Sequence, residues 1–170
     1  MTSFLNRLGG SDDASPPELV CRRELWSQGT LELRRRTKGA TRESGAFLLG
    51  KEENGAKRIL DFVYYEDLDP DALSTGIVHF NGNRFTALWT ICRERGYGVV
   101  ADVHVHPYGY EQSTSDRANP SMPRAGHIAI ILPNFAAGTP EPGRIGLYKY
   151  LGNRRWQTQT RQGAQFFRLD

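Results

Sequence analysis

The sequence is poor in cysteine, in charge of one sign and in long apolar runs. Only two of its 170 residues are cysteines, Cys21 and Cys92, which excludes a disulfide framework and a four-cysteine zinc site. The net charge is +3, and basic side chains cluster only at 34–36, so we expect no nucleic-acid partner. The longest apolar runs, such as 128–133, fall far short of the roughly 18 residues of a membrane span, so we expect no membrane partner.

The remaining composition fits one globular domain, with 38% hydrophobic and 24% charged residues. Residues 1–17 are rich in Gly, Ser, Asp and Pro, and we expect them to form a flexible leader before a single domain over 18–170. This leader lacks the apolar core of a signal peptide, which favours a cytoplasmic protein.

Hydrophobic periodicity predicts an α/β fold: a single domain with a mixed β-sheet flanked by helices. The Glu-Glu-Asn-Gly turn between the second and third expected strands predicts a hairpin, and Gly96 should end the second helix. The expected strands cover 19–25, 43–51, 58–65, 76–80, 97–106, 127–132, 143–150, 154–160 and 165–169, and the expected helices cover 26–36 and 83–95.

The most informative stretch is 101–120, where His104 and His106 stand two residues apart at the end of an apolar strand. Strand geometry places both imidazoles on one face of the sheet. Asp116 follows ten residues later, after a proline and a glycine that favour a turn back toward the strand end. Two imidazoles and a carboxylate suit Zn²⁺, and three protein ligands leave the fourth tetrahedral position open, as in catalytic zinc sites.

These residue types also have purely structural interpretations. A histidine pair alone is typical of an exposed strand end, and Ser113 with Asp116 matches the capping box that begins a helical turn, a role compatible with metal binding. His79 and His127 have apolar neighbours, so we expect hydrogen-bonded structural side chains there. His127 follows the site loop, where a supporting role is the alternative.

Other reactive or charged residues lie outside the expected site. Both cysteines are interpreted as small buried residues, and the arginines at 34–36 as a solvated helix face, with docking to an acidic partner as the alternative. Tyr108 and Tyr110 flank the site loop, where they either line a groove for an extended substrate tail or serve only in packing.

Three segments together resemble the JAB/MPN family and its JAMM metalloprotease motif: a glutamate in ESGAFLLG (43–50), HVHP (104–107) and STSD (113–116). The flanking segments DRANP and GHIAIILPNF are similar to bacterial JAB proteins encoded beside ubiquitin-activation-like and conjugation-like enzymes. Those proteins include members of Bil- and CBASS-type antiphage operons. The resemblance extends from about Leu19 onward.

The resemblance implies a JAB/MPN-like fold and a zinc-dependent, deubiquitinase-like isopeptidase that cleaves after the C-terminal glycine of a ubiquitin-like modifier. It makes His104, His106 and Asp116 zinc ligands, Glu43 the general acid/base and Ser113 a hydrogen-bond donor to the tetrahedral oxyanion. The implied partners are the ubiquitin-like protein or its conjugates, and the activating-like and conjugating-like enzymes of the same operon.

The residues themselves are consistent with this chemistry. Hydrolysis of an isopeptide needs a carboxylate that takes a proton from water and gives it to the leaving amine, and Glu43 at the start of an apolar strand is the best candidate. The other acidic candidates lie in polar, turn-like stretches: Glu52, Glu53 and Glu111.

The oxyanion donor is less sharply defined than the ligands. Six residues separate His106 from Ser113, one fewer than the commonest family spacing, so Thr114 and Ser115 are alternative donors. Single donors of this kind contribute roughly 3 kcal/mol.

Two alternative functions stay open at this stage. A catalytically silent MPN-like scaffold would bind an activating or conjugating enzyme, and a JAB peptidase would process a sulfur-carrier protein with the same zinc chemistry. The nucleic-acid-linked RadC group also carries His-x-His and Ser-x-x-Asp, but ESGAFLLG and GHIAIILPNF resemble it less.

Overall fold

The computed structural model describes residues 15–74 and 82–170. The expected strand at 76–80, which contains His79, and residues 1–14 of the expected leader lie outside the described residues. In chain order the elements are β1 (Leu19–Cys21), α1 (Arg23–Arg36), β2 (Gly45–Glu53), β3 (Ala56–Tyr64), α2 (Tyr65–Leu68), α3 (Phe85–Arg95), β4 (Gly98–Val105), α4 (Thr114–Ala118), β5 (Ile128–Leu132), β6 (Gly146–Gly152), β7 (Arg155–Thr158) and β8 (Phe167–Leu169). Short 3₁₀ segments lie at Gly82–Arg84, Asn134–Ala136, Pro142–Arg144 and Thr160–Gln165.

The strands of the described residues form one eight-stranded mixed sheet in the order β7-β6-β5-β4-β2-β3-β1-β8. β4 lies inside the sheet, antiparallel to β2 and parallel to β5. β2 and β3 form the predicted hairpin, and its turn residues Asn54 and Gly55 have φ angles of 51° and 77°, the left-handed conformation that such turns require. The predicted α/β class with a mixed sheet is therefore confirmed.

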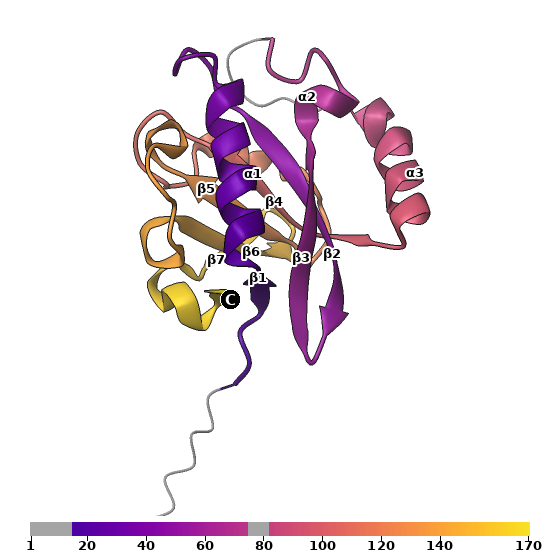
Figure 1. Cartoon of the computed structure of the whole chain (residues 1–170), viewed down its shortest axis with the longest axis vertical. Helices are drawn as coiled ribbons and strands as arrows, with labels where there is room; N and C mark the ends of the chain where they lie inside the picture. The colour runs from indigo at the N-terminus through magenta and orange to yellow at the C-terminus, as the bar shows by residue number, and fades with distance from the viewer. Residues whose placement is uncertain (1–14, 75–81) are drawn as a thin grey trace, which may run out of the picture.

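The two long helices cover opposite faces of the sheet. Successive side chains of a strand point to opposite sides, so two neighbouring residues of β2 show which face each helix covers. Trp26 and Leu33 of α1 belong to a buried cluster that includes Leu48 of β2. Leu88 of α3 belongs to a second cluster that includes Phe47, the preceding residue of β2. Figure 1 shows α1 lying across the sheet and α3 standing beside β2 and β3. No helix among the described residues has the length and apolar character that crossing a bilayer requires.

Several predicted boundaries shift. The strand expected over 19–25 ends at Cys21, because the Trp26 backbone N–H already donates to the carbonyl of Arg22 (3.0 Å) and so begins α1. The first residues of the strand expected from 143 belong instead to a 3₁₀ turn that starts at Pro142. Gly96 ends α3 as predicted, in a left-handed conformation with φ 64°.

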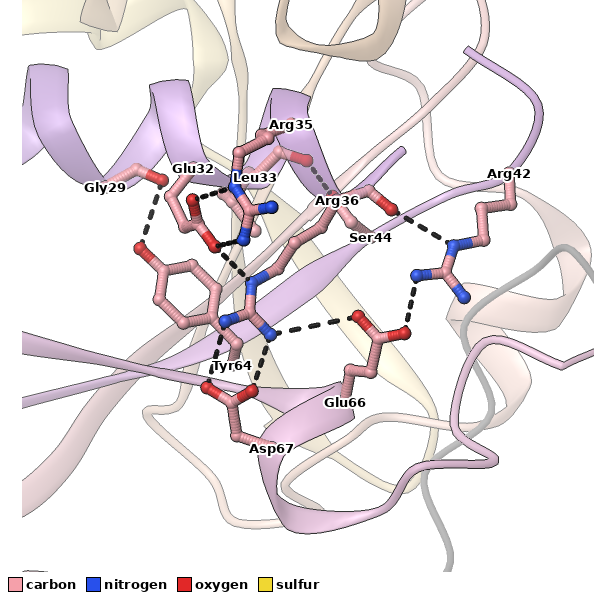
Figure 2. A network of polar contacts seen from close by, with 10 residues as sticks. All are labelled: Gly29, Glu32, Leu33, Arg35, Arg36, Arg42, Ser44, Tyr64, Glu66 and Asp67. Atoms are coloured by element: carbon pink, nitrogen blue, oxygen red, sulfur yellow. Dashed lines mark hydrogen bonds and ion pairs between the residues drawn. The ribbon is translucent and has the colours of Figure 1, made fainter. Parts of the chain in front are cut away.

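The interpretation of 34–36 as a solvated helix face is wrong for its last arginine. Arg34 and Arg35 are exposed, but the side chain of Arg36 is only 15% exposed. Its guanidinium donates to Glu32 (2.7 Å) and Asp67 (2.7 Å) and lies over a tyrosine ring (Figure 2). The side chain therefore ties α1 to α2.

Candidate metal centre

Strand β4 presents the two histidines of the HVHP segment on the face of the sheet that α3 partly covers. His104 lies within the strand, and His106 follows its last residue, where the His106 N–H donates to the carbonyl of Leu132 (2.8 Å) and continues the pairing with β5. The two Nε2 atoms lie 2.9 Å apart. Both side chains are largely buried, at 10% and 13% exposure, so their ring nitrogens are shielded from bulk water.

The third member of the cluster comes from α4. Asp116 Oδ1 lies 3.4 Å from His104 Nε2, and Asp116 Oδ2 lies 3.3 Å from His106 Nε2. A capping box begins α4: the Ser113 N–H donates to Asp116 Oδ2 (2.7 Å), and the Asp116 N–H donates to Ser113 Oγ (3.1 Å). The cap therefore turns the Asp116 carboxylate toward the histidines.

The distances fit a tetrahedral zinc ion. Metal–ligand bonds of about 2.0–2.1 Å at tetrahedral angles separate the ligand atoms by about 3.3 Å. The two histidine–aspartate separations are close to this value, each to a different carboxylate oxygen, and the histidine–histidine separation is shorter, at 2.9 Å. Among the described residues, these three side chains form the group of possible metal ligands, with all their ligand atoms within 4.8 Å of one another.

The charges in this cluster favour an ionised carboxylate. Burial raises the pKa of Asp116, but hydrogen bonds to His104 and His106 outweigh it and hold that pKa far below its usual range. Burial lowers the pKa of His104, but the Asp116, Asp102 and Glu43 carboxylates together outweigh it, so its pKa is raised. Asp116 is therefore an anion at neutral pH, the state in which a carboxylate binds metal.

Glu43 lies beside the cluster but outside the set of three ligands. Gly45 of β2 pairs with His104 of β4, and the Val105 N–H donates to the carbonyl of Ser44 (2.9 Å). Glu43 therefore lies two residues before the residue of β2 that pairs with His104. The effect of its charge on the pKa of His104 agrees with that placement.

Ser113 and its two alternatives occupy the start of α4. Ser113 is exposed, and its hydroxyl accepts the N–H of Asp116; a hydroxyl that accepts one hydrogen bond can still donate one. Ser115 lines the same pocket as Asp116, and Thr114 is the first residue of the helix. The geometry thus keeps Ser113 next to the ligands and leaves Ser115 as a second hydroxyl on the pocket wall.

Two further buried residues, which the sequence did not single out, support the cluster. Asp102 is 2% exposed and lies two residues before His104 on the same face of β4. Its Oδ2 accepts from the hydroxyl of Tyr65 (3.1 Å), and its Oδ1 lies 2.5 Å from His127 Nε2. Burial, followed by the Asp102 charge, raises the pKa of Tyr65 well above its ordinary value. His127 is thus a hydrogen-bonded structural histidine, as predicted, and it contacts a neighbour of the ligands.

The pattern VVADVHV contained the signal for Asp102: an acidic residue two positions before a histidine must share its face of the strand. Gly45 explains how Tyr65 reaches it. A Cβ at Gly45 would clash with the Tyr65 ring and with the carbonyl of Val103, so only glycine leaves this position open.

A pocket of about 430 Å³ opens next to the cluster, and Tyr65, Phe85, Asp102, His104, Asp116 and Trp156 are among the residues that line it. A larger hollow of about 670 Å³ near Arg58 and Phe166 contains none of the predicted site residues. The smaller pocket therefore reaches two members of the cluster, His104 and Asp116.

The two tyrosines that flank the site loop differ in burial. Tyr108 is 82% exposed and free of the core, whereas Tyr110 packs against the buried cluster of Ala129 and Ile131.

Cys21 and Cys92 are buried, as predicted. Burial raises the pKa of the Cys21 thiol to about 12, so this thiol is not a nucleophile at neutral pH.

No family model matches the chain. Its fold is similar to the solution structure of protein DSY2949 from Desulfitobacterium hafniense, with a TM-score of 0.58, 13% sequence identity and coverage of 89% of this chain and 92% of that one. It is also similar to the solution structure of a protein from Salinibacter ruber (strain DSM 13855), with a TM-score of 0.54, 16% identity and coverage of 82% and 87%. At these identities the likeness concerns the fold alone.

Proposed function

We propose that the chain is a zinc-dependent isopeptidase of the JAB/MPN type, a deubiquitinase-like hydrolase that cleaves after the C-terminal glycine of a ubiquitin-like modifier. The observation that carries the proposal is the convergence of His104, His106 and Asp116 at zinc-like separations, with Glu43 two residues before the partner of His104 in β2. The resemblance of ESGAFLLG, HVHP and STSD to the JAMM motif supplies the substrate class. We further propose that the protein is cytoplasmic and acts beside the activating-like and conjugating-like enzymes of a bacterial antiphage operon.

The roles follow from position and chemistry. Zn²⁺ held by the three ligands supplies Lewis acidity toward the isopeptide carbonyl and lowers the pKa of water toward about 7. Glu43 takes a proton from the attacking water and later gives it to the departing lysine amine. Ser113 donates a hydrogen bond to the carbonyl oxygen as negative charge develops there.

The test measures zinc content and cleavage on the same preparation. The substrate is a ubiquitin-like protein with an aminocoumarin amide on its C-terminal glycine. We expect one zinc per chain and metal-dependent release of the fluorophore. Glu43→Ala should keep the zinc and lose at least 100-fold in rate, whereas Glu52→Ala, which changes an exposed carboxylate near the hairpin turn, should cleave like the wild type.

Other outcomes would contradict the proposal. Stoichiometric zinc with an intact substrate, and an equally intact lysine-linked conjugate, would exclude the isopeptidase. A chain that holds no zinc after supplementation would favour the scaffold. Cleavage confined to a sulfur-carrier precursor would assign the peptidase function.

A further inference from the structure

The one-turn helix α2 contacts both halves of the candidate site through two consecutive residues. The Tyr65 hydroxyl donates to Asp102 on β4, the strand that carries the histidine ligands. The Glu66 carboxylate accepts from Arg42, the residue that precedes Glu43 (2.6 Å). The two side chains therefore link one short element to the metal ligands on one side and to the proposed acid/base on the other.

The segment that carries Glu43 is fixed by its two neighbours in sequence. On one side, Arg42 donates from Nε to the carbonyl of Arg36 (3.0 Å) and from Nη2 to Glu66 Oε1 (2.6 Å). On the other side, Ser44 donates from Oγ to the buried carbonyl of Leu33 (2.7 Å). Figure 2 shows Arg42 and Ser44 reaching α1 at separate points, with Glu66 between the guanidinium groups of Arg36 and Arg42.

This anchoring matters because Glu43 lies before the first paired residue of its strand. β2 begins only at Gly45, and residues 38–40 of the preceding turn are in left-handed conformations with φ between 51° and 74°. The backbone N–H groups of Thr41 and Arg42 donate back to the carbonyl of Thr37 at the end of α1, not to the sheet. The hydrogen bonds of the Arg42 side chain therefore restrain this segment, as backbone hydrogen bonds between strands restrain the paired part of β2.

The Arg42–Glu66 pair is better placed than an ordinary surface ion pair. Its side chains are only 13% and 28% exposed, so water screens it less than an open pair. Glu66 also lies 3.8 Å from Arg36, which forms further ion pairs with Glu32 and Asp67. The carboxylate is thus held from two sides, and Arg42 with it.

We infer that Arg42 and Glu66 are positioning residues for Glu43, and that α2 sets the placement of Glu43 relative to the ligand strand. This inference rests on the proposed function, because it gives Glu43 a catalytic role. Small displacements of a reacting group are costly: about 1 Å can lower a rate by roughly 100-fold. Neither residue touches the ligands, so their loss should leave the metal site itself intact.

The test uses the full-length chain with Arg42→Gln and Glu66→Gln. The matched control is Arg35→Gln, which removes a 72% exposed guanidinium of the same polar network that bonds to Glu32 and keeps the backbone bond from Lys38 to the carbonyl of residue 35. Hydrogen exchange is measured in the peptide covering 40–46 of the metal-free protein. We expect at least fivefold faster exchange there in both test variants and no change in the control.

The zinc-loaded variants supply the second readout. Arg42→Gln and Glu66→Gln should bind zinc one to one and lose at least tenfold in kcat with little change in KM, while Arg42→Lys, which keeps the charge, should recover part of the loss. Exchange in 40–46 that is unchanged in Glu66→Gln, or equally raised in Arg35→Gln, would overturn the inference. If the wild type cleaves nothing, the proposed function fails, and the exchange result still decides whether the pair anchors the segment.

Discussion

Ser113 and Asp116 hold each other at the start of α4, and the Asp116 oxygen that accepts from the Ser113 N–H also faces His106, at 3.3 Å. One carboxylate is therefore both the partner of a helix cap and a member of the metal cluster. A change at Ser113 acts on the stability of α4 and on the site together, and the two effects have to be separated by the choice of substitution.

Ser113→Ala removes the hydroxyl that accepts the Asp116 N–H but keeps the backbone N–H that orients the carboxylate. We expect the free energy of unfolding to fall by about 1 kcal/mol, zinc to remain bound and cleavage to slow by about 100-fold. Chemical denaturation, metal analysis and the aminocoumarin assay measure the three quantities. Glycine costs an N-cap only a few tenths of a kcal/mol and has no side-chain donor, so Ser113→Gly should restore most of the stability but not the rate. Recovery of both would limit Ser113 to a capping role, and Ser115→Ala would then test the second hydroxyl.

Removal of the metal should weaken the protein without unfolding it, because the two large buried clusters do not include the ligands. A ligand present at about 1,000 times its dissociation constant stabilises a fold by about 4 kcal/mol. We therefore expect a chelator to lower Tm by several degrees at unchanged circular dichroism, and added zinc to restore it. His106→Ala should show no response to either treatment. A chelated chain that loses its secondary structure would indicate a structural metal instead.

Tyr65→Phe removes the hydrogen bond to Asp102 and leaves a buried carboxylate with fewer donors. An unsatisfied buried group costs about 1–3 kcal/mol, and we expect a loss of that size in the free energy of unfolding. Tyr64→Phe is the matched control, because the Tyr64 hydroxyl is only half-buried and its bond to the carbonyl of Gly29 is long, at 3.4 Å. Equal losses in the two variants would show that the bond to Asp102 contributes no more to the free energy of unfolding than the Tyr64 bond does.

Stability at low pH should depend on Glu32. Its hydrogen bond to Arg35, with Arg36 beside it, lowers the pKa of Glu32 to about 2. A carboxyl with a lowered pKa stabilises the fold fully above its unfolded value of about 4.3 and loses that effect as the pH falls toward the folded value. Because Arg35 is exposed, we expect only about 1 kcal/mol at neutral pH. Glu32→Gln should thus be less stable than the wild type at pH 7 and equal to it near pH 2. A difference that is constant with pH would contradict this.

The longer strands and the two long helices could be predicted from the sequence because each carries a long enough pattern. The apolar run at 127–132 and the Asn54–Gly55 turn indicate strands and a hairpin, and the spacing of Leu88 and Cys92 indicates the buried face of α3. The prediction that His104 and His106 share one face of the sheet needed only the two-residue period of a strand. These features are local, and the rest of the structure did not alter them.

Other parts depend on contacts between distant residues. α2 and α4 span four and five residues, too few for a helical period to appear. The contact of Tyr65 with Asp102 joins residues 37 apart, and it requires both the pairing of β2 with β4 and the absence of a side chain at Gly45. The pairing of Gly45 with His104, which brings the residues before β2 near the ligands, likewise requires the register of two strands, which the sequence does not contain.

The hairpin turn at Asn54 and Gly55 lies at the end of β2 opposite to Glu43. About 3.3 Å per residue places the exposed Glu52 roughly 23 Å along the strand from Gly45. Both native thiols are buried, so a cysteine introduced at Glu52 would be the accessible one for a maleimide reagent. A dye or a surface attached there would stay clear of the pocket, which makes this turn a convenient handle for single-molecule and immobilised-binding measurements.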